Sequence, residues 1–270
     1  MKTAFVTGAN RGIGFTICEQ LLKFYKFDKI YLGCRNLEKG NEAAEKLSKF
    51  GTVIPLVIDI SSEDSIKTAY ETYLKLKEND EMLDVLVNNA AVNLDWIPNK
   101  WYGNAFEIDT KTIEQIFRVN MLGGFLVTKY FKDSIRDNGS VVNVGTGAAE
   151  LANACANSPD YPFYSAAKLA LYMLTKKMGA VLKSRKISVN MACPGWCKTG
   201  MGGELAVDGP EVGADSILKA AFIGQNQKPT GKFMRYGKII PIDSYYTAKP
   251  KLKLTDRIKR IFNLMNLLYW

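Results

Sequence analysis

The 270-residue sequence predicts a single α/β domain, in which a doubly wound parallel sheet of about seven strands carries helices on both faces. Short apolar runs alternate along the chain with longer segments whose apolar residues recur at helical spacing. The apolar runs are nearly continuous, as expected for strands that are covered on both faces. Neither an internal repeat nor a low-complexity linker divides the chain, and its length suits one large domain.

The strands are recognised as short apolar runs. The first run enters a glycine-rich turn directly, and most later runs are spaced so that a helix fits between them. We expect strands at residues 3–7, 29–32, 53–58, 83–87, 140–144, 187–192 and 238–241.

The helices fill the segments between these strands. In the first helix, Ile13, Ile17, Leu21 and Phe24 recur at helical spacing. Ser61 is a suitable N-cap for the third helix. We expect helices at residues 13–25, 37–49, from Ser61 onward, 111–134 and 164–184, and long loops at 92–110, 147–163 and 200–212. Ligands bind to such loops where they follow the carboxyl ends of parallel strands.

Composition excludes several classes of protein. Hydrophobic residues make up 47% of the chain and charged residues 23%, which is typical of a globular protein. No run approaches the roughly 18–20 apolar residues of a membrane-spanning helix, and we expect no secretion signal. The chain has no histidine, which excludes Ser-His-Asp and Cys-His hydrolases and leaves acid–base chemistry to Tyr, Lys, Asp, Glu or Cys.

The five cysteines are scattered, and no histidine accompanies them, so we expect neither a zinc site nor any other metal centre. Free thiols in a reducing cytoplasm are the simplest interpretation, and we expect a cytoplasmic protein. The net charge of +9 suits a phosphate-bearing ligand as well as nucleic acid. Because no nucleic-acid-binding motif is present, we expect no nucleic-acid partner.

A glycine-rich segment, residues 7–14, joins the first strand to the first helix. Glycine permits the tight turn and lets backbone N–H groups approach a pyrophosphate, which the helix N-terminus also attracts. In this strand–turn–helix context the pattern predicts dinucleotide binding. Arg35 follows the second strand, where an NAD-binding protein usually has a carboxylate, and Arg11 lies in the glycine segment. Both cations favour NADPH over NADH, although two solvated surface arginines would give the same pattern.

Tyr164 and Lys168 are spaced to share one face of a helix. Spacing alone is weak, because four other Tyr–Lys pairs, Tyr172–Lys176 among them, have the same separation. Position distinguishes Tyr164, which lies just beyond the fifth strand and its loop.

The motifs together resemble the short-chain dehydrogenase/reductase family, which has the Rossmann fold, and are most similar to its carbonyl reductase branch. The resemblance extends from Lys2 to about Ile242. Its ordered motifs are Thr7-Gly8-x-x-x-Gly12-x-Gly14, Asp59, Asn88-Asn89-Ala90, Asn120, Tyr164-x-x-x-Lys168 and Pro194-Gly195-Trp196-Cys197-Lys198-Thr199.

The resemblance implies an NADP-dependent reductase that transfers hydride to a carbonyl group. It makes Tyr164 the general acid, Lys168 the residue that lowers the tyrosine pKa and binds the nicotinamide ribose, and Asn120 the residue that fixes a proton-feeding water. The implied cofactor-binding residues are Gly8, Asn10, Arg11, Gly12, Ile13, Gly14, Arg35, Asp59, Ile60, Asn88, Ala90, Tyr164, Lys168, Pro194, Gly195, Trp196 and Thr199.

One position departs from the family pattern. Thr146 stands where the family usually places a serine that binds the substrate carbonyl. Threonine keeps the hydroxyl but adds a methyl group and a stiffer χ1. We expect activity to survive. The alternative hypothesis is a dinucleotide-binding sensor or partner protein with little or no turnover.

Aromatic residues in the loops favour a small, fairly apolar ketone or aldehyde as substrate, although some of these rings could simply cover the core. They are Trp96, Trp101, Tyr102, Phe106, Tyr161 and Phe163. We interpret residues 1–242 as the dinucleotide-binding and catalytic domain. Residues 243–270 form a basic amphipathic extension that could dock on protein, contact a membrane surface through residues 249–270, or stay disordered. Relatives commonly pair through helices equivalent to 111–134 and 164–184, so we expect a homodimer or homotetramer.

Overall fold

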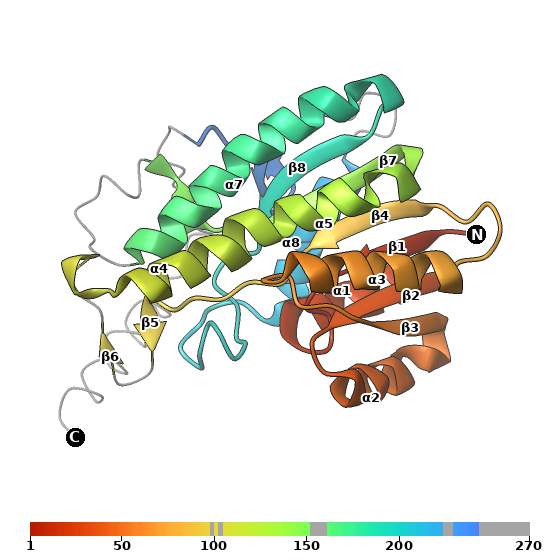
Figure 1. Ribbon diagram of the computed structural model, residues 1–270, viewed down its shortest axis with the longest axis horizontal. Coiled ribbons are helices and arrows are strands. Elements are labelled where there is room, and N and C mark those ends of the chain that lie inside the picture. The colour runs from red at the N-terminus through yellow and green to blue at the C-terminus, as the bar shows by residue number, and fades with distance from the viewer. Residues whose placement is uncertain (98–99, 102–104, 152–160, 224–228, 243–270) are drawn as a thin grey trace, which may run out of the picture.

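The computed structural model of the protein describes residues 1–97, 100–101, 105–151, 161–223 and 229–242. Within these residues strands and helices alternate, and Figure 1 shows a sheet with helices packed in front of it and behind it. The expected extension, residues 243–270, lies outside the described residues, as do residues 152–160 of the expected loop 147–163.

The main sheet has eight strands in the order β3-β2-β1-β4-β7-β8-β9-β10. Within this main sheet, as far as the structure describes it, seven strands run parallel and β10 is antiparallel to its neighbour β9. The bounds are β1 (Thr3–Val6), β2 (Lys29–Cys34), β3 (Thr52–Val57), β4 (Leu83–Asn88), β7 (Ile135–Val144), β8 (Ser188–Cys193), β9 (Phe233–Arg235) and β10 (Lys238–Ile239). The expected parallel sheet is confirmed. From β1 the next strands along the chain are added on one side, and from β4 they are added on the other side. Ligands bind in such folds at this switch point between β1 and β4.

Eight helical segments connect or flank these strands on the described path. They are α1 (Gly12–Lys23), α2 (Leu37–Leu47), α3 (Glu63–Leu76), α4 (Thr110–Phe117), the π-helix η3 (Arg118–Gly123), α5 (Gly124–Phe131), α7 (Pro162–Val181) and α8 (Pro210–Phe222). Short 3₁₀ turns cover Ser48–Phe50, Ala105–Glu107, Lys132–Ser134, Gly147–Ala149 and Leu182–Arg185. A separate small hairpin pairs β5 (Trp96–Ile97) with β6 (Lys100–Trp101) in the expected loop 92–110.

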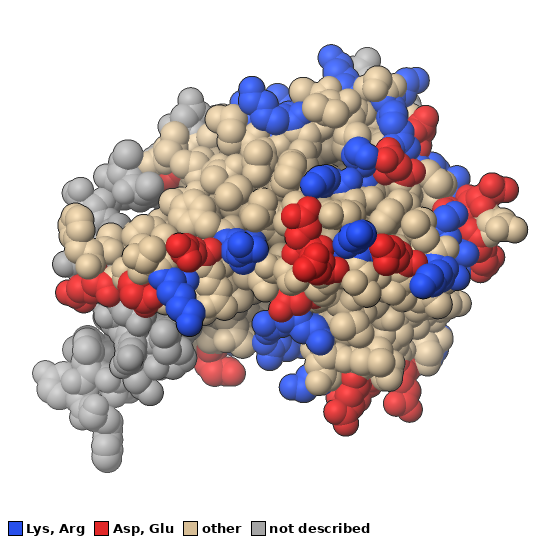
Figure 2. All heavy atoms as spheres, in the orientation of Figure 1, with Lys and Arg blue, Asp and Glu red and all other residues tan. Residues whose placement is uncertain are grey.

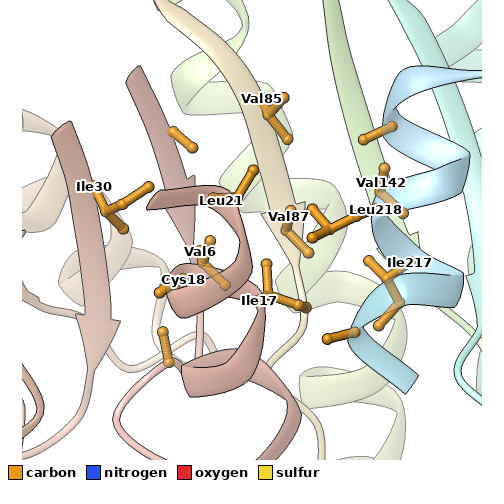
Figure 3. Close-up of a cluster of buried hydrophobic side chains, with 14 of the residues drawn as sticks. Val6, Ile17, Cys18, Leu21, Ile30, Val85, Val87, Val142, Ile217 and Leu218 are labelled. Atoms are coloured by element: carbon orange, nitrogen blue, oxygen red, sulfur yellow. The ribbon is translucent and has the colours of Figure 1, made fainter. Parts of the chain in front are cut away.

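Two hydrophobic clusters, one on each face, hold the helices to the sheet. Figure 3 shows the first cluster, in which α1 and α8 pack on the strands through Ile17, Leu21, Ile217 and Leu218. The second cluster joins α3, α5 and α7 to the opposite face, with Phe131 at its centre. Each fully buried side chain of this size contributes about 1.5–3 kcal/mol of transfer free energy, so the scaffold around the site is firmly packed.

Several expected boundaries were wrong. Ser62, not Ser61, caps α3, because the Ser61 hydroxyl is bonded to Asp59 instead. The expected helix 111–134 is three successive segments, α4, η3 and α5, followed by a 3₁₀ turn. The expected strand 238–241 is the short strand β10, which pairs with the unforeseen β9.

The sequence analysis also missed helix α8, which begins within the expected loop 200–212. Its buried side is made largely of small residues such as Gly213, Ala214, Ala220 and Ala221. Small residues give little contrast between the two faces of a helix, so the helical pattern was weak. None of the helices in the described ranges is both long and apolar enough to cross a membrane.

Candidate active site

The glycine-rich loop between β1 and α1 is fixed by the turn that follows β4. Thr7 Oγ1 accepts hydrogen bonds from the backbone N–H groups of Asn89, at 3.0 Å, and Ala90, at 3.1 Å. The Asn89 side chain donates in turn to the carbonyl oxygens of Thr7 and Gly8. Gly8 has a φ of +63°, and a Cβ at this position would lie 2.9 Å from the Ala90 Cα. The turn therefore requires glycine at position 8.

The N-terminus of α1 offers backbone donors that no side chain caps. Its N-cap residue, Arg11, makes no side-chain capping bond, and the first turn, which includes Gly12, Ile13 and Gly14, holds no acidic residue. By contrast, α2, α3 and α4 each have a side-chain cap. Free N–H groups and the partial positive charge of a helix N-terminus suit an anionic pyrophosphate, so this end of α1 fits a dinucleotide.

The segment after β8 meets the glycine loop from the other side. A Cβ built on Gly12 would lie 3.5 Å from Cγ2 of Thr199, which places the two loops against each other. Within the same segment Pro194 is buried, Gly195 has a φ of +85°, and Trp196 is half exposed. Thr199, one of the expected cofactor residues, is therefore adjacent to the α1 N-terminus.

The two arginines that favour NADPH are solvent-exposed near the glycine loop and the end of β2. Arg35 follows β2 directly, and Arg11 is the N-cap of α1. Over the described ranges neither arginine is in an ion pair, so both guanidinium groups could bind a phosphate. Asn10 is half-buried beside Arg11, and Asp59, beyond β3, accepts hydrogen bonds from Ser61. Ile60 is buried against η3.

Helix α7 presents Tyr164 and Lys168 one turn apart. Lys168 Nζ donates a 2.8 Å hydrogen bond to the carbonyl oxygen of Val144, at the end of β7, and lies 5.8 Å from the centroid of the Tyr164 ring. Burial lowers the pKa of Lys168 to about 8 and raises the pKa of Tyr164 above its ordinary value. The Tyr164 phenol is thus protonated at neutral pH, while the Lys168 ammonium group can lose its proton close to neutral pH.

A second Tyr–Lys pair on α7 shows what distinguishes the first. Lys176 Nζ also lies 5.8 Å from the centroid of its tyrosine ring, that of Tyr172. Lys176 is exposed, however, whereas Lys168 is only 1% exposed. A buried lysine is costly unless it has a role or a partner, so burial rather than spacing makes Lys168 the candidate functional residue of the two.

The start of α7 is held by a residue that the sequence analysis missed. Asp95 is almost completely buried, and its Oδ2 accepts a 2.6 Å hydrogen bond from the backbone N–H of Tyr164. Burial raises the pKa of Asp95, while this backbone hydrogen bond opposes the shift. Asp95 therefore fixes the first turn of the helix that carries the tyrosine.

Thr146 is half-buried immediately beyond β7. Its Oγ1 accepts a 3.2 Å hydrogen bond from the backbone N–H of Ala148 and caps the 3₁₀ turn there. In the described part of the chain its O–H donates to no partner, so the hydroxyl can still donate to a ligand oxygen.

Asn120 lies in the π-helix η3, and its side chain is hydrogen-bonded to the backbone of Val92. Its Nδ2 donates to the Val92 carbonyl oxygen at 2.7 Å, and its Oδ1 accepts from the Val92 N–H at 3.1 Å. The side chain thus ties η3 to the loop after β4. π-turns of this kind often occur at functional sites.

The structure brings no metal-binding cluster together in the ranges it describes. Cys18, Cys34, Cys193 and Cys197 are free and buried, while Cys155 lies outside the described residues.

Comparison with known proteins identifies the family. The family model described as short chain dehydrogenase matches residues 2–208. The chain belongs to the short-chain dehydrogenase family. This family consists of oxidoreductases, and the resemblance predicted from the motifs is confirmed.

Relatives of this short-chain dehydrogenase include several reductases. The short-chain dehydrogenase anuI of Penicillium roqueforti is 28% identical over 85% of this chain and 92% of that protein. Carbonyl reductase 1 (NADPH) of Sus scrofa is 27% identical over 90% of this chain and 96% of that protein.

Solved structures agree on the fold. The angucycline C-6 ketoreductase LanV with bound NADP is 26% identical, with a TM-score of 0.74 over 87% of this chain and 94% of that chain. The NADPH-bound carbonyl reductase from chicken fatty liver has a TM-score of 0.78 over 89% of this chain and 98% of that chain. At 22% identity the latter similarity supports the fold alone.

Asn88 of this short-chain dehydrogenase has a structural role in addition to its place in the motif. Its Nδ2 lies within hydrogen-bond distance of three acceptors, the Gly124 carbonyl oxygen, Thr128 Oγ1 and Asn143 Oδ1, and Asn143 donates to Thr175. This buried network joins β4, β7, α5 and α7 beneath the site. Asn143 was missed, although a polar residue inside the apolar run of β7 was the available signal.

Proposed function

We propose that this protein reduces the carbonyl group of a small, fairly apolar ketone or aldehyde to an alcohol, with NADPH as the hydride donor. The observation that carries the proposal is the buried ammonium group of Lys168 beside Tyr164, at the carboxyl edge of the sheet. A buried lysine beside a protonated phenol is a proton-donating arrangement, which reduction of a carbonyl requires.

NADPH is the proposed cofactor because the arginines near the glycine loop and the end of β2 are exposed and available. Arg35 follows Cys34 at the end of β2, and no carboxylate is present there to bind a free ribose 2′-hydroxyl. The α1 N-terminus would bind the pyrophosphate, and Asp59, Ile60 and Ala90 would frame the adenosine half. Relatives support the choice, since the Sus scrofa enzyme is named for NADPH and LanV was solved with NADP.

In the proposed mechanism the protein supplies the proton and orients the substrate. When bound, NADPH supplies the hydride. Thr146 donates a hydrogen bond to the substrate oxygen, and Tyr164 transfers its phenolic proton to that oxygen as negative charge develops there. The Lys168 ammonium stabilises the resulting tyrosinate and would hydrogen-bond the nicotinamide ribose. Pro194, Gly195, Trp196 and Thr199 would hold the nicotinamide end.

Replacing Tyr164 by phenylalanine tests the proposal. Tyr164→Phe removes the proton donor but keeps the ring, so kcat should fall on the order of 10²–10⁴-fold while the Kd for NADPH changes little. The matched control is Tyr172→Phe, which lies on the same helix with the same spacing to a lysine. Its kcat should equal that of the parent protein. A Tyr164→Phe variant that reduces carbonyl compounds at the parent rate would refute the mechanism.

The alternative function is a dinucleotide sensor with little or no turnover. It would be favoured if the parent protein bound NADPH tightly yet oxidised none of it with any aryl aldehyde, quinone or aliphatic ketone supplied.

The proposed assembly is a cytoplasmic homodimer or homotetramer. Helices α4 and α7 pack side by side, and in Figure 2 uncharged side chains predominate over the middle of α7, while charged side chains lie over α4, α3 and α5. Met173 and Val181 of α7 are exposed apolar residues that a second copy could cover. Light scattering after gel filtration would measure the mass, and a monomer would refute the assembly.

A further inference from the structure

The loop that carries Thr146 ends in a buried acid. Glu150 has no solvent-exposed surface, and its Oε1 forms an ion pair with Nη2 of Arg235 in β9. The side chain of Arg235 is itself only 14% exposed. Only three residues therefore lie between Thr146, the proposed substrate-binding residue, and Glu150, whose buried ion pair involves neither Tyr164 nor Lys168.

Arg235 is positioned directly beneath this loop. In the parallel register of β8 and β9 it pairs with Cys193, the last residue of β8, at the carboxyl edge of the sheet. The guanidinium group passes so close to Gly147 that a methyl group on that residue would overlap Nη2. The arginine thus contacts the turn next to Thr146 and also the acid at its end.

Backbone hydrogen bonds tie the loop at both ends. The N–H of Gly145 donates to the carbonyl oxygen of Ala192 in β8 at 2.8 Å. The N–H of Leu151 donates to the carbonyl oxygen of Ile242 at 2.9 Å. Between these two points the Glu150–Arg235 ion pair links the loop to β9.

We propose that Glu150 and Arg235 are positioning residues, which hold the Thr146 hydroxyl where the substrate oxygen must bind. The inference rests on the proposed function, because it needs Thr146 to contact the substrate. A buried guanidinium–carboxylate pair fixes distance and orientation at once, since the fork of the guanidinium is planar. A donor displaced by about 1 Å can cost on the order of 100-fold in rate.

The same molecule contains a buried ion pair that serves as a control. Lys29 Nζ lies 2.8 Å from Oε2 of Glu81, and both residues are buried. This pair sits where β2 begins and just before β4, at the amino edge of the sheet and thus opposite the site. Its removal should disturb packing as much as removal of the Glu150–Arg235 pair does, but it should not move Thr146.

The experiment compares Glu150→Gln/Arg235→Met with Lys29→Met/Glu81→Gln and with Thr146→Ala. Each double variant removes both charges, so neither leaves a lone buried ion. We would measure kcat and KM for the aryl aldehyde that the parent reduces fastest, the Kd for NADPH, and amide hydrogen exchange of residues 146–151 in the NADPH complex.

The inference predicts that Glu150→Gln/Arg235→Met lowers kcat on the order of 10- to 100-fold, leaves the Kd for NADPH unchanged, and speeds exchange in the loop. The control pair should keep the parent kcat and loop exchange. Arg235→Lys, which keeps a cation but loses the fork, should give a smaller loss of kcat. If Glu150→Gln/Arg235→Met does not fold, Arg235→Lys is measured in its place.

Two results would overturn the inference. The first is a Glu150→Gln/Arg235→Met variant with the parent kcat and loop exchange, although Thr146→Ala loses activity. The second is an equal loss of kcat in the control pair, which would make the effect one of general stability. If Thr146→Ala keeps the parent kcat, the proposed contact between Thr146 and the substrate fails, and if the parent reduces no carbonyl compound, the proposed function itself fails.

Discussion

Burial of a single lysine distinguishes the proposed catalytic Tyr–Lys pair from a second pair on the same helix. Lys168 and Lys176 lie at the same distance from their tyrosine rings on one helix. Only Lys168 is enclosed, where its ammonium group donates to the Val144 carbonyl oxygen and its pKa falls to about 8. The residue can therefore lose its proton at a pH close to neutral, which an exposed lysine does not.

This lowered pKa predicts that the kcat/KM for NADPH depends on pH near neutrality. Because Tyr164 has a raised pKa, Lys168 is the first of the two to lose its proton as the pH rises. The kcat/KM for NADPH reports groups of the free enzyme and should fall as the pH rises through about 8. Lys168→Arg keeps the positive charge over this pH range, so the residual kcat/KM of this variant should not fall near pH 8. If the same fall persists in Lys168→Arg, another titrating group causes it.

Arg35 gives a prediction about cofactor choice. Arg35→Asp replaces a cation by a carboxylate that repels a 2′-phosphate and can accept from a free ribose hydroxyl. The Kd for NADPH, followed by tryptophan fluorescence, should rise about tenfold or more, and the Kd for NADH should fall. Lys46→Asp is the matched control, because this exposed residue lies in the last turn of α2 and changes the net charge equally. If both substitutions changed the Kd values equally, Arg35 would act only through long-range electrostatics and not through contact with the 2′-phosphate.

At the scale of elements, the β1–α1 turn is specified by its contact with the turn after β4. Gly8→Ala would place a methyl group 2.9 Å from the Ala90 Cα at a φ of +63°. We expect it to lower the free energy of unfolding by about 1–2 kcal/mol and to weaken NADPH binding. Gly200→Ala is the control, because no atom lies within 4 Å of that added methyl group. Urea unfolding and an NADPH titration would measure both effects, and a Gly8→Ala protein equal to the control would contradict this view of the turn.

Elements and residues with a local signal could be predicted from the sequence. The glycine turn, the parallel strands and Tyr164 with Lys168 each depend on residues that are close together in the chain. Asp95, Glu150 and Arg235 could not be found in this way, because their contacts join segments far apart in sequence. The π-helix η3 was missed for a related reason, since Asn120 is held by Val92 from another loop.

At the scale of the whole molecule, topology gathers the site at one edge of the sheet. The loops after β1, β4, β7 and β8 all leave the carboxyl ends of neighbouring parallel strands. Hydrophobic clusters on both faces keep these strands in register, and the Asn88 network joins β4 to β7 directly below. Figure 1 shows α4 and α7 extending over this end of the sheet, so the helix that carries Tyr164 reaches the same edge.

Hydride transfer from NADPH to a carbonyl carbon is the central claim, and isotope transfer measures it directly. Both 4-deuterated epimers of NADPH would be supplied in turn with an aryl aldehyde, and the alcohol product would be analysed by mass spectrometry. We expect one epimer to give an alcohol with deuterium on the former carbonyl carbon, and Tyr164→Phe to form almost none of it. An alcohol without deuterium from either epimer, or tight NADPH binding with no alcohol formed from any carbonyl compound, would contradict the assignment of this protein as a carbonyl reductase.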